Sequence, residues 1–249
     1  MRKLLFFLVV GFLQACQSQV TQEDVDRMVQ DYLDRYGVEF FEKTIEKYLA
    51  IKREEGRLIE EPEILETLNE PLEGAWREAM PLLGAKEAPV QVVLVADFED
   101  PFSGRAFQSM KALKDKYGDR LVVGFRYNPL DKFQGSEKWA AAAEAAHRQG
   151  KFWEMSEFIF TNNSKLGEVQ ILNWAKDLNM NVDQFQKDWK SAEVQELVTE
   201  DRSFFRSRDM KSTPALIFNG GVFYGAREPE RFQRIIDTIL KSKSKSKTK

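Results

Sequence analysis

Cysteine and histidine carry much of the nucleophilic, redox and metal chemistry of proteins, and this chain of 249 residues has one of each, Cys16 and His147. A single cysteine excludes an internal disulfide and a Cys-x-x-Cys redox pair. One cysteine and one histidine are also too few ligands for the usual Cys/His zinc sites. Any Ser-His-Asp triad or Cys-His pair would have to use His147. The two counts therefore remove much of the usual enzyme repertoire.

The composition indicates a globular protein with an acidic body. Hydrophobic residues make up 43% of the chain, enough for a core in one domain with an accessory region or in two small domains. The net charge of -3 hides an asymmetry. Without Arg2, Lys3 and the five lysines of the last nine residues, 30 basic residues face 40 acidic ones, a net charge of about -10. An acidic body binds nucleic acid poorly, so we expect no nucleic-acid partner.

Residues 241–249 alternate lysine with serine or threonine. Such a segment has no apolar face to pack, and the sequence predicts a disordered, solvated tail. The alternative is contact of these lysines with an anionic lipid or polymer.

The first fifteen residues have the pattern of an export signal. A basic start is followed by ten apolar residues, Leu4 to Leu13, too few for a membrane-spanning helix but suited to a signal peptide. The segment ends in Leu13-Gln14-Ala15-Cys16, which resembles the lipobox of bacterial lipoproteins. The resemblance implies removal of residues 1–15 and acylation of Cys16, which tethers the protein to a membrane. The alternative is an ordinary secretory signal followed by a coincidental cysteine.

Gln17 follows this cysteine, and in enteric lipoproteins such a residue directs sorting to the outer membrane. We therefore expect a lipid-anchored protein of the bacterial cell envelope, in the outer membrane and facing the periplasm. The inner membrane and the cell surface are the alternatives.

Residues 16–87 are predicted to be a tether followed by helices. Thr21 suits a helix N-cap, and apolar residues follow at helical spacing up to Tyr36, then over 41–56 and again over 62–80. The apolar faces either pack against the following domain or make residues 21–80 a self-associating stalk or dimer arm; no sustained heptad repeat decides the choice. A linker is expected at 84–89.

From residue 90 onward, strand and helix patterns alternate. Residues 90–98 and 121–127 are near-continuous apolar runs, as expected of strands buried on both faces, and a helix stopped by Gly118 joins them as a parallel pair. A helical stretch covers about residues 136–205. The order then ends with a strand at 215–219, a Gly220-Gly221 turn, a strand at 222–224 and a helix at about 228–240.

This order resembles the thioredoxin-like domain of the bacterial DsbA family of thiol:disulfide oxidoreductases, over about residues 88–240. Three stretches carry the resemblance: 97–103 (DFEDPFS), 150–155 (GKFWEM) and 212–220 (STPALIFNG). They correspond to the family's Cys-Pro-x-Cys motif, part of its helical insertion and its cis-proline loop. The resemblance implies an α/β thioredoxin-like fold with a helical insertion at about 136–205, preceded by an N-terminal helical region.

The resemblance places the two redox cysteines at positions 100 and 103. This chain has Asp100 and Ser103 there, within the segment Asp100-Pro101-Phe102-Ser103. Disulfide exchange needs a thiolate nucleophile and a sulfur leaving group, which neither aspartate nor serine supplies. We therefore expect no thiol-disulfide oxidoreductase activity and no catalytic residue in this degenerate motif. Asp100 suits a helix N-cap, with Pro101 at the first helical position.

The alternative is that Asp100 or Ser103 is a replacement catalytic group. A serine nucleophile needs a base, and nothing near it in the sequence supplies one. His147 lies on a predicted insertion helix, where a surface or structural role is favoured over catalysis.

Thr213-Pro214 carries the second candidate site. The resemblance implies a cis peptide bond here, beside which family members hold an extended substrate chain. Thr213, Pro214 and Phe102 are therefore candidate peptide-binding residues.

The sequence thus predicts a cell-envelope lipoprotein whose redox-inactive domain binds a protein or peptide, in a scaffolding or chaperone-like role. The alternative is an enzyme of glutathione-transferase-like or isomerase-like chemistry that uses the N-terminus of the motif helix. We expect no cofactor and no metal site.

Overall fold

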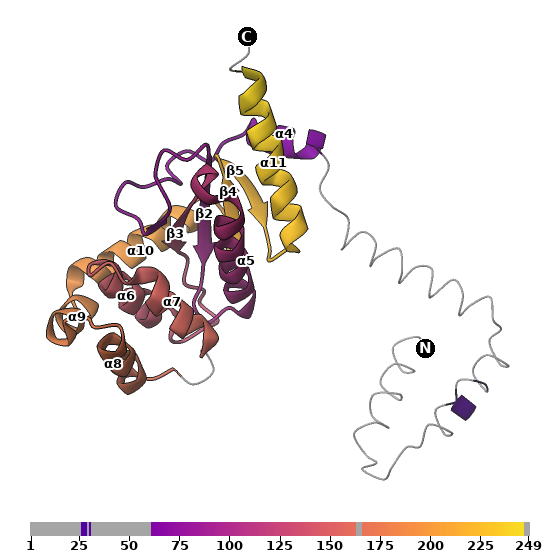
Figure 1. The fold of residues 1–249 in the computed structure, drawn as a ribbon. Helices are drawn as coiled ribbons and strands as arrows, with labels where there is room; N and C mark the ends of the chain where they lie inside the picture. The colour runs from indigo at the N-terminus through magenta and orange to yellow at the C-terminus, as the bar shows by residue number, and fades with distance from the viewer. Residues whose placement is uncertain (1–25, 29, 31–60, 163–165, 247–249) are drawn as a thin grey trace. The chain divides into compact units, whose positions relative to one another are not determined.

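A computed structural model describes residues 26–28, 30, 61–162 and 166–246 of the chain (Figure 1). The chain divides into two units, residues 1–57 and residues 58–249. In the first unit, residues 26–28 and 30 are helical, within the first helix predicted after Thr21. The predicted signal peptide, Cys16, Gln17 and the helix predicted over 41–56 lie outside the described residues.

The second unit is built on one mixed β-sheet with the strand order β1-β3-β2-β4-β5. β2 (Val90–Ala96) and β3 (Leu121–Tyr127) are parallel, with Val90 opposite Leu121 and Ala96 opposite Tyr127. The remaining pairs are antiparallel: β4 (Ala215–Phe218) with β2, β5 (Gly221–Tyr224) with β4, and β1 (Leu82–Leu83) with β3. The predicted parallel pair and the predicted hairpin are therefore confirmed.

The hairpin turn lies one residue earlier than predicted. Phe218 pairs with Gly221, which leaves Asn219 and Gly220 as the two turn residues. Both have positive φ, 46° and 99°, as a type I′ hairpin turn requires. Asparagine and glycine are the residues that adopt this conformation at least cost, which explains the position of the turn.

Helices connect the strands and form the insertion. α5 (Pro101–Tyr117) runs from β2 toward β3 and ends at Gly118, which opens a short 3-10 turn, Gly118–Arg120. Over its described residues, 136–162 and 166–206, the predicted helical insertion has five helices: α6 (Ser136–His147), α7 (Phe152–Thr161), α8 (Glu168–Asp177), α9 (Val182–Trp189) and α10 (Ala192–Arg206). The last helix is α11 (Pro229–Ser246).

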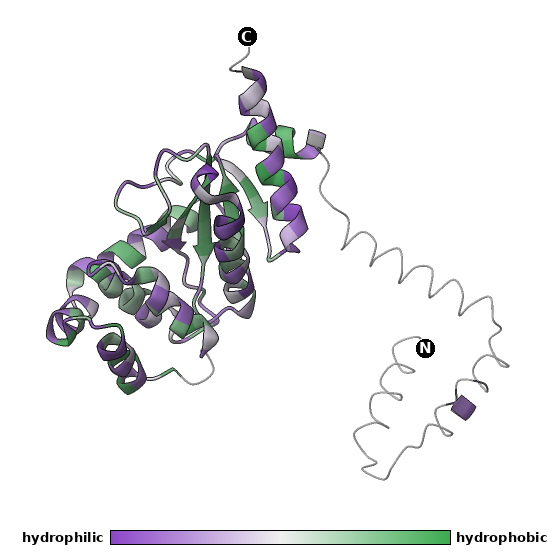
Figure 2. Ribbon diagram, viewed as in Figure 1, coloured by the Kyte–Doolittle hydropathy of each residue, from purple (hydrophilic) through white to green (hydrophobic). Residues whose placement is uncertain are grey.

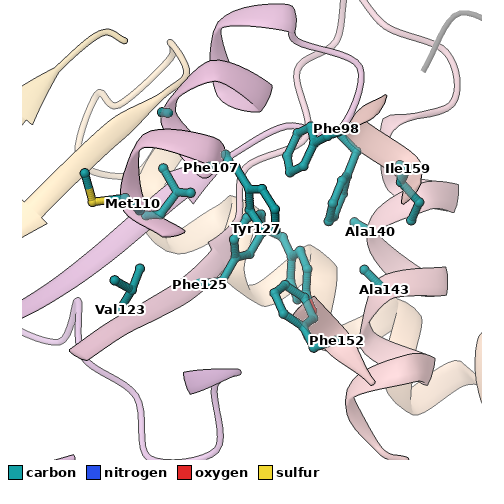
Figure 3. Close-up of a cluster of buried hydrophobic side chains, with 14 of the residues drawn as sticks. Phe98, Phe107, Met110, Val123, Phe125, Tyr127, Ala140, Ala143, Phe152 and Ile159 are labelled. Atoms are coloured by element: carbon teal, nitrogen blue, oxygen red, sulfur yellow. The ribbon is translucent and has the colours of Figure 1, made fainter. Parts of the chain in front are cut away.

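The sheet is buried on both faces, and alternate residues of the central strands β2 and β4 enter different clusters. Val92 and Leu94 of β2 belong to the larger cluster, and Val93 and Val95 belong to the smaller one. The strands are accordingly mostly apolar (Figure 2), with Gln91 in β2 and Arg126 in β3 as the polar exceptions. Buried aromatic rings join the sheet, α5 and the insertion in the larger cluster (Figure 3): Phe98, Phe107, Phe125, Tyr127 and Phe152.

The segment before β2 corrects one prediction. The helix predicted over 62–80 is the shorter α4 (Glu61–Leu68), because Pro71 cannot donate a helical hydrogen bond and disfavours helix in the residue before it. The chain continues without helix, and Ala75 and Met80 pack into the smaller cluster.

The helix α4 also packs on the second unit. α4 contacts α11 and β5, and Ile64 is fully buried in the larger cluster. The compact unit that contains the predicted domain over 88–240 therefore also includes α4. For this third helix, packing against the domain is the alternative that the structure supports.

The C-terminal lysines are also more ordered than predicted. α11 continues through Ser246, so the disorder predicted from residue 241 is wrong for 241–246; residues 247–249 are not described. Lys243 Nζ donates to Pro89 O at 2.7 Å, and Ser242 Oγ donates to Ile239 O at 2.8 Å. Lysine favours helix, and cations near a helix C-terminus interact favourably with the helix dipole. Within the described ranges, no helix is long and apolar enough to cross a bilayer.

A buried ion pair fixes the end of the insertion against the sheet. Arg126 on β3 donates from Nε and Nη2 to Asp201 Oδ1 on α10, at 2.9 and 2.7 Å. Asp201 Oδ2 accepts from the backbone N–H of Tyr127 at 3.1 Å. The Asp201 side chain is fully buried, and Arg77 Nη1 also lies 3.6 Å from its Oδ1. Loss of Asp201 would therefore leave the buried Arg126 without its counterion. This pair positions α10, from whose end the chain runs to Thr213.

Candidate functional site

The degenerate motif begins with a capped helix. Asp100 is the N-cap of α5, with extended backbone (φ -84°, ψ 115°), and Pro101 occupies the first turn. The Asp100 carboxylate accepts from the backbone N–H groups of Phe102 and Ser103, each at 3.2 Å. These N–H groups have no partner inside a helix, and the cap satisfies them. The capping interpretation of Asp100 is therefore confirmed.

The same carboxylate also binds the proline loop. Asp100 Oδ2 accepts from Thr213 Oγ1 and from Ser103 Oγ, each at 2.8 Å. Asp100 is 2% exposed, so its carboxylate is surrounded by these four donors. The sequence predicts the cap and names Thr213 as a peptide-binding candidate, but it does not predict the hydrogen bond between Thr213 and Asp100, which are 113 residues apart.

Ser103 is held inside the protein. Its side chain is fully buried, and its Oγ donates to Asp100 and accepts from the backbone N–H of Asp97 at 3.2 Å. A nucleophile needs an accessible oxygen and a base that takes its proton. The Ser103 hydroxyl is inaccessible and already engaged on both sides, so this arrangement does not suit it for catalysis.

Asp97 joins the motif to the start of the insertion. Its Oδ1 accepts from Ser136 Oγ at 2.6 Å and from the backbone N–H of Glu99 at 2.8 Å, and its Oδ2 accepts from the N–H of Leu130 at 2.7 Å. Burial raises the pKa of Asp97; the nearby charge of Asp100 adds to this rise, and the hydrogen bonds oppose it. Sequence reasoning missed Asp97; the available signal was a carboxylate directly after an apolar strand.

Around this cluster, the Phe102 side chain is exposed, and Thr213 is half-buried with an unpaired backbone. Phe102 is 52% exposed, and the Arg105 guanidinium lies 4.8 Å from its ring centroid. The Thr213-Pro214 peptide bond is cis, as the resemblance implied. Among the described residues, no hydrogen bond uses the backbone N–H or C=O of Thr213. We call the Thr213 backbone the ledge. Phe102 N and Thr213 Oγ1 both donate to the Asp100 carboxylate, so Phe102 and the ledge are neighbours.

Two cavities adjoin these residues. The first, of about 520 Å³, lies between α5 and α7 and is lined by Pro101, Gly104, Arg105, Gln108, Ser109, Phe160 and Thr161. The second, of about 340 Å³, lies beside the proline loop and is lined by Leu130, Asp131, Lys132, Arg206, Lys211, Ser212 and Thr213. The Thr213 ledge thus borders the second cavity, into which a bound chain can place side chains.

The contacts of His147 are those of a residue with a structural role. It ends α6, half-buried, with its ring edge-to-face against Phe152 at a centroid distance of 6.2 Å. Burial lowers its pKa, and a hydrogen bond with the backbone of Ala79 opposes this shift. No group of three or more His, Cys, Asp or Glu residues in the described segments is arranged to hold a metal ion.

Residues 77–238 match the thioredoxin family. A stretch of 140 residues is 34% identical to the Na(+)/H(+) antiporter NhaA 1 of Mycolicibacterium vanbaalenii; it covers 55% of this chain and 23% of the antiporter. The chain thus spans about a quarter of the length of the curated relatives it matches.

Solved structures show the same fold. A thioredoxin-like oxidoreductase from Silicibacter pomeroyi has a TM-score of 0.58 and 24% identity, over 66% of this chain and 94% of that one. The thiol-disulfide exchange protein alpha-DsbA2 from Wolbachia pipientis has a TM-score of 0.58 and 20% identity, over 64% and 86% of the two chains. The predicted thioredoxin-like fold of DsbA type is therefore confirmed.

The bond between Asp100 and Thr213 predicts an energetic coupling between these residues. Asp100→Ala should destabilise the protein by about 2 kcal/mol, because it removes the cap and leaves buried donors unpaired. Thr213→Val should cost about 1 kcal/mol, and the double variant should cost less than the sum by about 1 kcal/mol. Urea unfolding of the four proteins measures this coupling.

Thr199 provides the matched control. Its exposed hydroxyl donates to the backbone of Gln195, remote in sequence from the motif. Thr199→Val combined with Asp100→Ala should show additive costs. Additive losses of unfolding free energy for the Asp100 and Thr213 variants would contradict a direct hydrogen bond between these two side chains.

Proposed function

The chain belongs to the thioredoxin family, and on that premise we propose that it is a redox-inactive, lipid-anchored protein of the bacterial cell envelope. Its thioredoxin-like domain binds extended segments of other proteins, in a scaffolding or chaperone-like role. One observation carries the proposal: Asp100 bridges the motif helix to Thr213, whose own backbone makes no hydrogen bond within the described residues.

Redox inactivity follows from the groups at the motif. The two positions that would need sulfur hold a carboxylate and a hydroxyl, and both are buried in one hydrogen-bonded cluster. Neither Asp100 nor Ser103 can form the mixed disulfide through which thiol-disulfide exchange proceeds. The glutathione-transferase-like or isomerase-like alternative has less support, because a ligand at the helix N-terminus meets a capped helix and an inaccessible Ser103.

Peptide binding is supported by the groups that remain exposed. An extended segment placed along Thr213 can exchange backbone hydrogen bonds with its free N–H and C=O, as in strand addition. Phe102 adds an exposed ring beside this ledge, where an apolar side chain of the segment can pack. The bound segment needs no defined sequence for either contact, which suits a scaffold or chaperone-like protein.

The envelope location rests on the sequence. Leu13-Gln14-Ala15-Cys16 resembles a lipobox, and Gln17 favours the outer membrane with the domain facing the periplasm. Two or more acyl chains on Cys16 would anchor the chain stably. Residues 21–80 include α4, Ala75 and Met80, which pack on the domain; self-association through the part of this region that precedes α4 is part of the proposal.

The absence of redox activity is tested with the full chain carrying Cys16→Ser, so that no other thiol is present. This protein should not accelerate insulin reduction by dithiothreitol. The further changes Asp100→Cys and Ser103→Cys should create activity, because the N-terminus of α5 stabilises a thiolate at position 100 and the second cysteine resolves the mixed disulfide. Ser103→Cys alone is the control and should stay inactive. Insulin reduction by the protein without added cysteines would contradict the prediction.

Peptide binding is tested with an unfolded probe: fluorescein-labelled α-lactalbumin that has been reduced and carbamidomethylated. Phe102→Ser should weaken its binding about tenfold, since burial of a phenyl ring contributes on the order of 1.5 kcal/mol. Val169→Ser changes a residue that is also exposed, on α8, and should leave the affinity unchanged. Fluorescence anisotropy measures both affinities. Equal affinity for Phe102→Ser and the parent would remove Phe102 from the binding surface.

Lipid anchoring is tested in cells supplied with an alkyne fatty acid. The parent protein should carry the label and sediment with the outer membrane on a density gradient. Cys16→Ser should lose the label and the anchor, because no other side chain in the sequence supplies the acylated thiol. Cys16→Ser with Ser103→Cys controls for a thiol elsewhere and should stay unlabelled. A label on Cys16→Ser would contradict the assignment.

A further inference from the structure

The cavity beside Thr213 is cationic, although the body of the protein is acidic. We define the basic cavity as the space of about 340 Å³ that is lined by Lys132, Arg206, Lys211 and Thr213, together with Asp131 and two uncharged neighbours. Three cations thus face one carboxylate in its wall. A local excess of one charge in a concave site attracts ligands of the opposite charge.

The single carboxylate of the wall is already neutralised. Asp131 Oδ2 accepts from Arg206 Nη1 at 2.9 Å, and Asp131 Oδ1 pairs with Arg202. Hydrogen bonds and charges of these two arginines lower the pKa of Asp131, which therefore remains ionised and paired near neutral pH. Glu137 also pairs with Arg202, so Asp131 and Glu137 together balance the two arginines and leave the two lysines to set the sign of the cavity.

Both lysines are available to a ligand. Lys132 is exposed and lies with its Nζ 4.7 Å from the ring centroid of Phe133. Lys211 pairs with Asp209, but these side chains are 68% and 83% exposed, so water screens the pair and it exchanges readily. An incoming carboxylate can therefore recruit either ammonium without opening a buried ion pair.

The ledge gives the geometry of approach. Thr213 lines the basic cavity and also carries the free backbone groups that would hold an extended segment. In an extended chain, every second side chain points to the same side, at a spacing of about 6.6 Å. A segment paired with Thr213 therefore brings a side chain near the ledge to the mouth of the basic cavity.

We propose that the basic cavity selects extended segments that carry a carboxylate next to the part bound on Thr213. The carboxylate is a glutamate or aspartate side chain or the C-terminus of the segment. This inference rests on the proposed peptide-binding function and adds a substrate class to it: acidic extended peptides. Repulsion from the acidic body opposes such ligands elsewhere, so Lys132 and Lys211 fix where the carboxylate binds.

The test uses the full chain carrying Cys16→Ser and three fluorescein-labelled peptides of ten residues. The first alternates threonine and valine around a central glutamate and ends in an amide. The second has glutamine in place of the glutamate. The third is the glutamine peptide with a free C-terminal carboxylate. The first peptide should bind about tenfold more tightly than the second at low salt, and 0.5 M salt should reduce this difference because the charges are exposed, with a Debye length of about 4 Å.

Charge reversal assigns the effect to the cavity. Lys132→Glu with Lys211→Glu should abolish the preference for glutamate over glutamine. Lys176→Glu with Lys187→Glu makes the same change in net charge at exposed positions on α8 and α9, and the preference should remain. Thermal unfolding should give similar midpoints for both double variants, because none of the four lysines is buried.

The outcomes separate this inference from the function on which it rests. Equal binding of the glutamate and glutamine peptides, still weakened by Phe102→Ser, would overturn the selectivity and leave peptide binding intact. No binding of any peptide or of unfolded lactalbumin would overturn both. A gain limited to the third peptide would support carboxylate selection and identify the chain terminus as its source.

Discussion

The Asp100 carboxylate is the constraint on which the site depends. A charged group at 2% exposure is tolerated only where donors replace the water it has lost, and here two backbone N–H groups and two hydroxyls do so. Because these donors come from both α5 and the proline loop, the requirement to satisfy one carboxylate also fixes the distance between the two segments. The position of the ledge follows from this constraint.

The bridge divides the site into an interior and a rim. Ser103 and the hydroxyl of Thr213 turn inward to Asp100, so neither is offered to a ligand. Phe102 and the Thr213 backbone remain outside, beside two cavities. The ion pair of Arg126 with Asp201 holds α10 on the sheet. Because the chain runs from the end of α10 to Thr213, this ion pair also helps to position the proline loop.

The sequence predicted the features that depend on local pattern. The apolar runs at β2 and β3, the helix-stopping Gly118 and the Asp100 cap all carry their signal within a few residues, and the structure has them. Pro71 is also a local signal, and in the structure it outweighs the apolar spacing that predicts a helix over 62–80. The contacts of Asp100 with Thr213 and of Asp97 with Leu130 join distant segments, so no spacing in the sequence encodes them.

Aspartate at position 100 places a carboxylate at the N-terminus of α5, where the redox motif of the resembled family places a thiolate. The N-terminus of α5 favours negative charge, and a thiolate and a carboxylate both benefit from the orphan N–H groups and the helix dipole. The carboxylate has two oxygens where a thiolate has one sulfur. One oxygen therefore reaches the N–H of Phe102 while the other accepts from Ser103 and Thr213. A carboxylate at this position thus keeps the negative charge that the helix N-terminus favours and uses its second oxygen to hold the proline loop against α5.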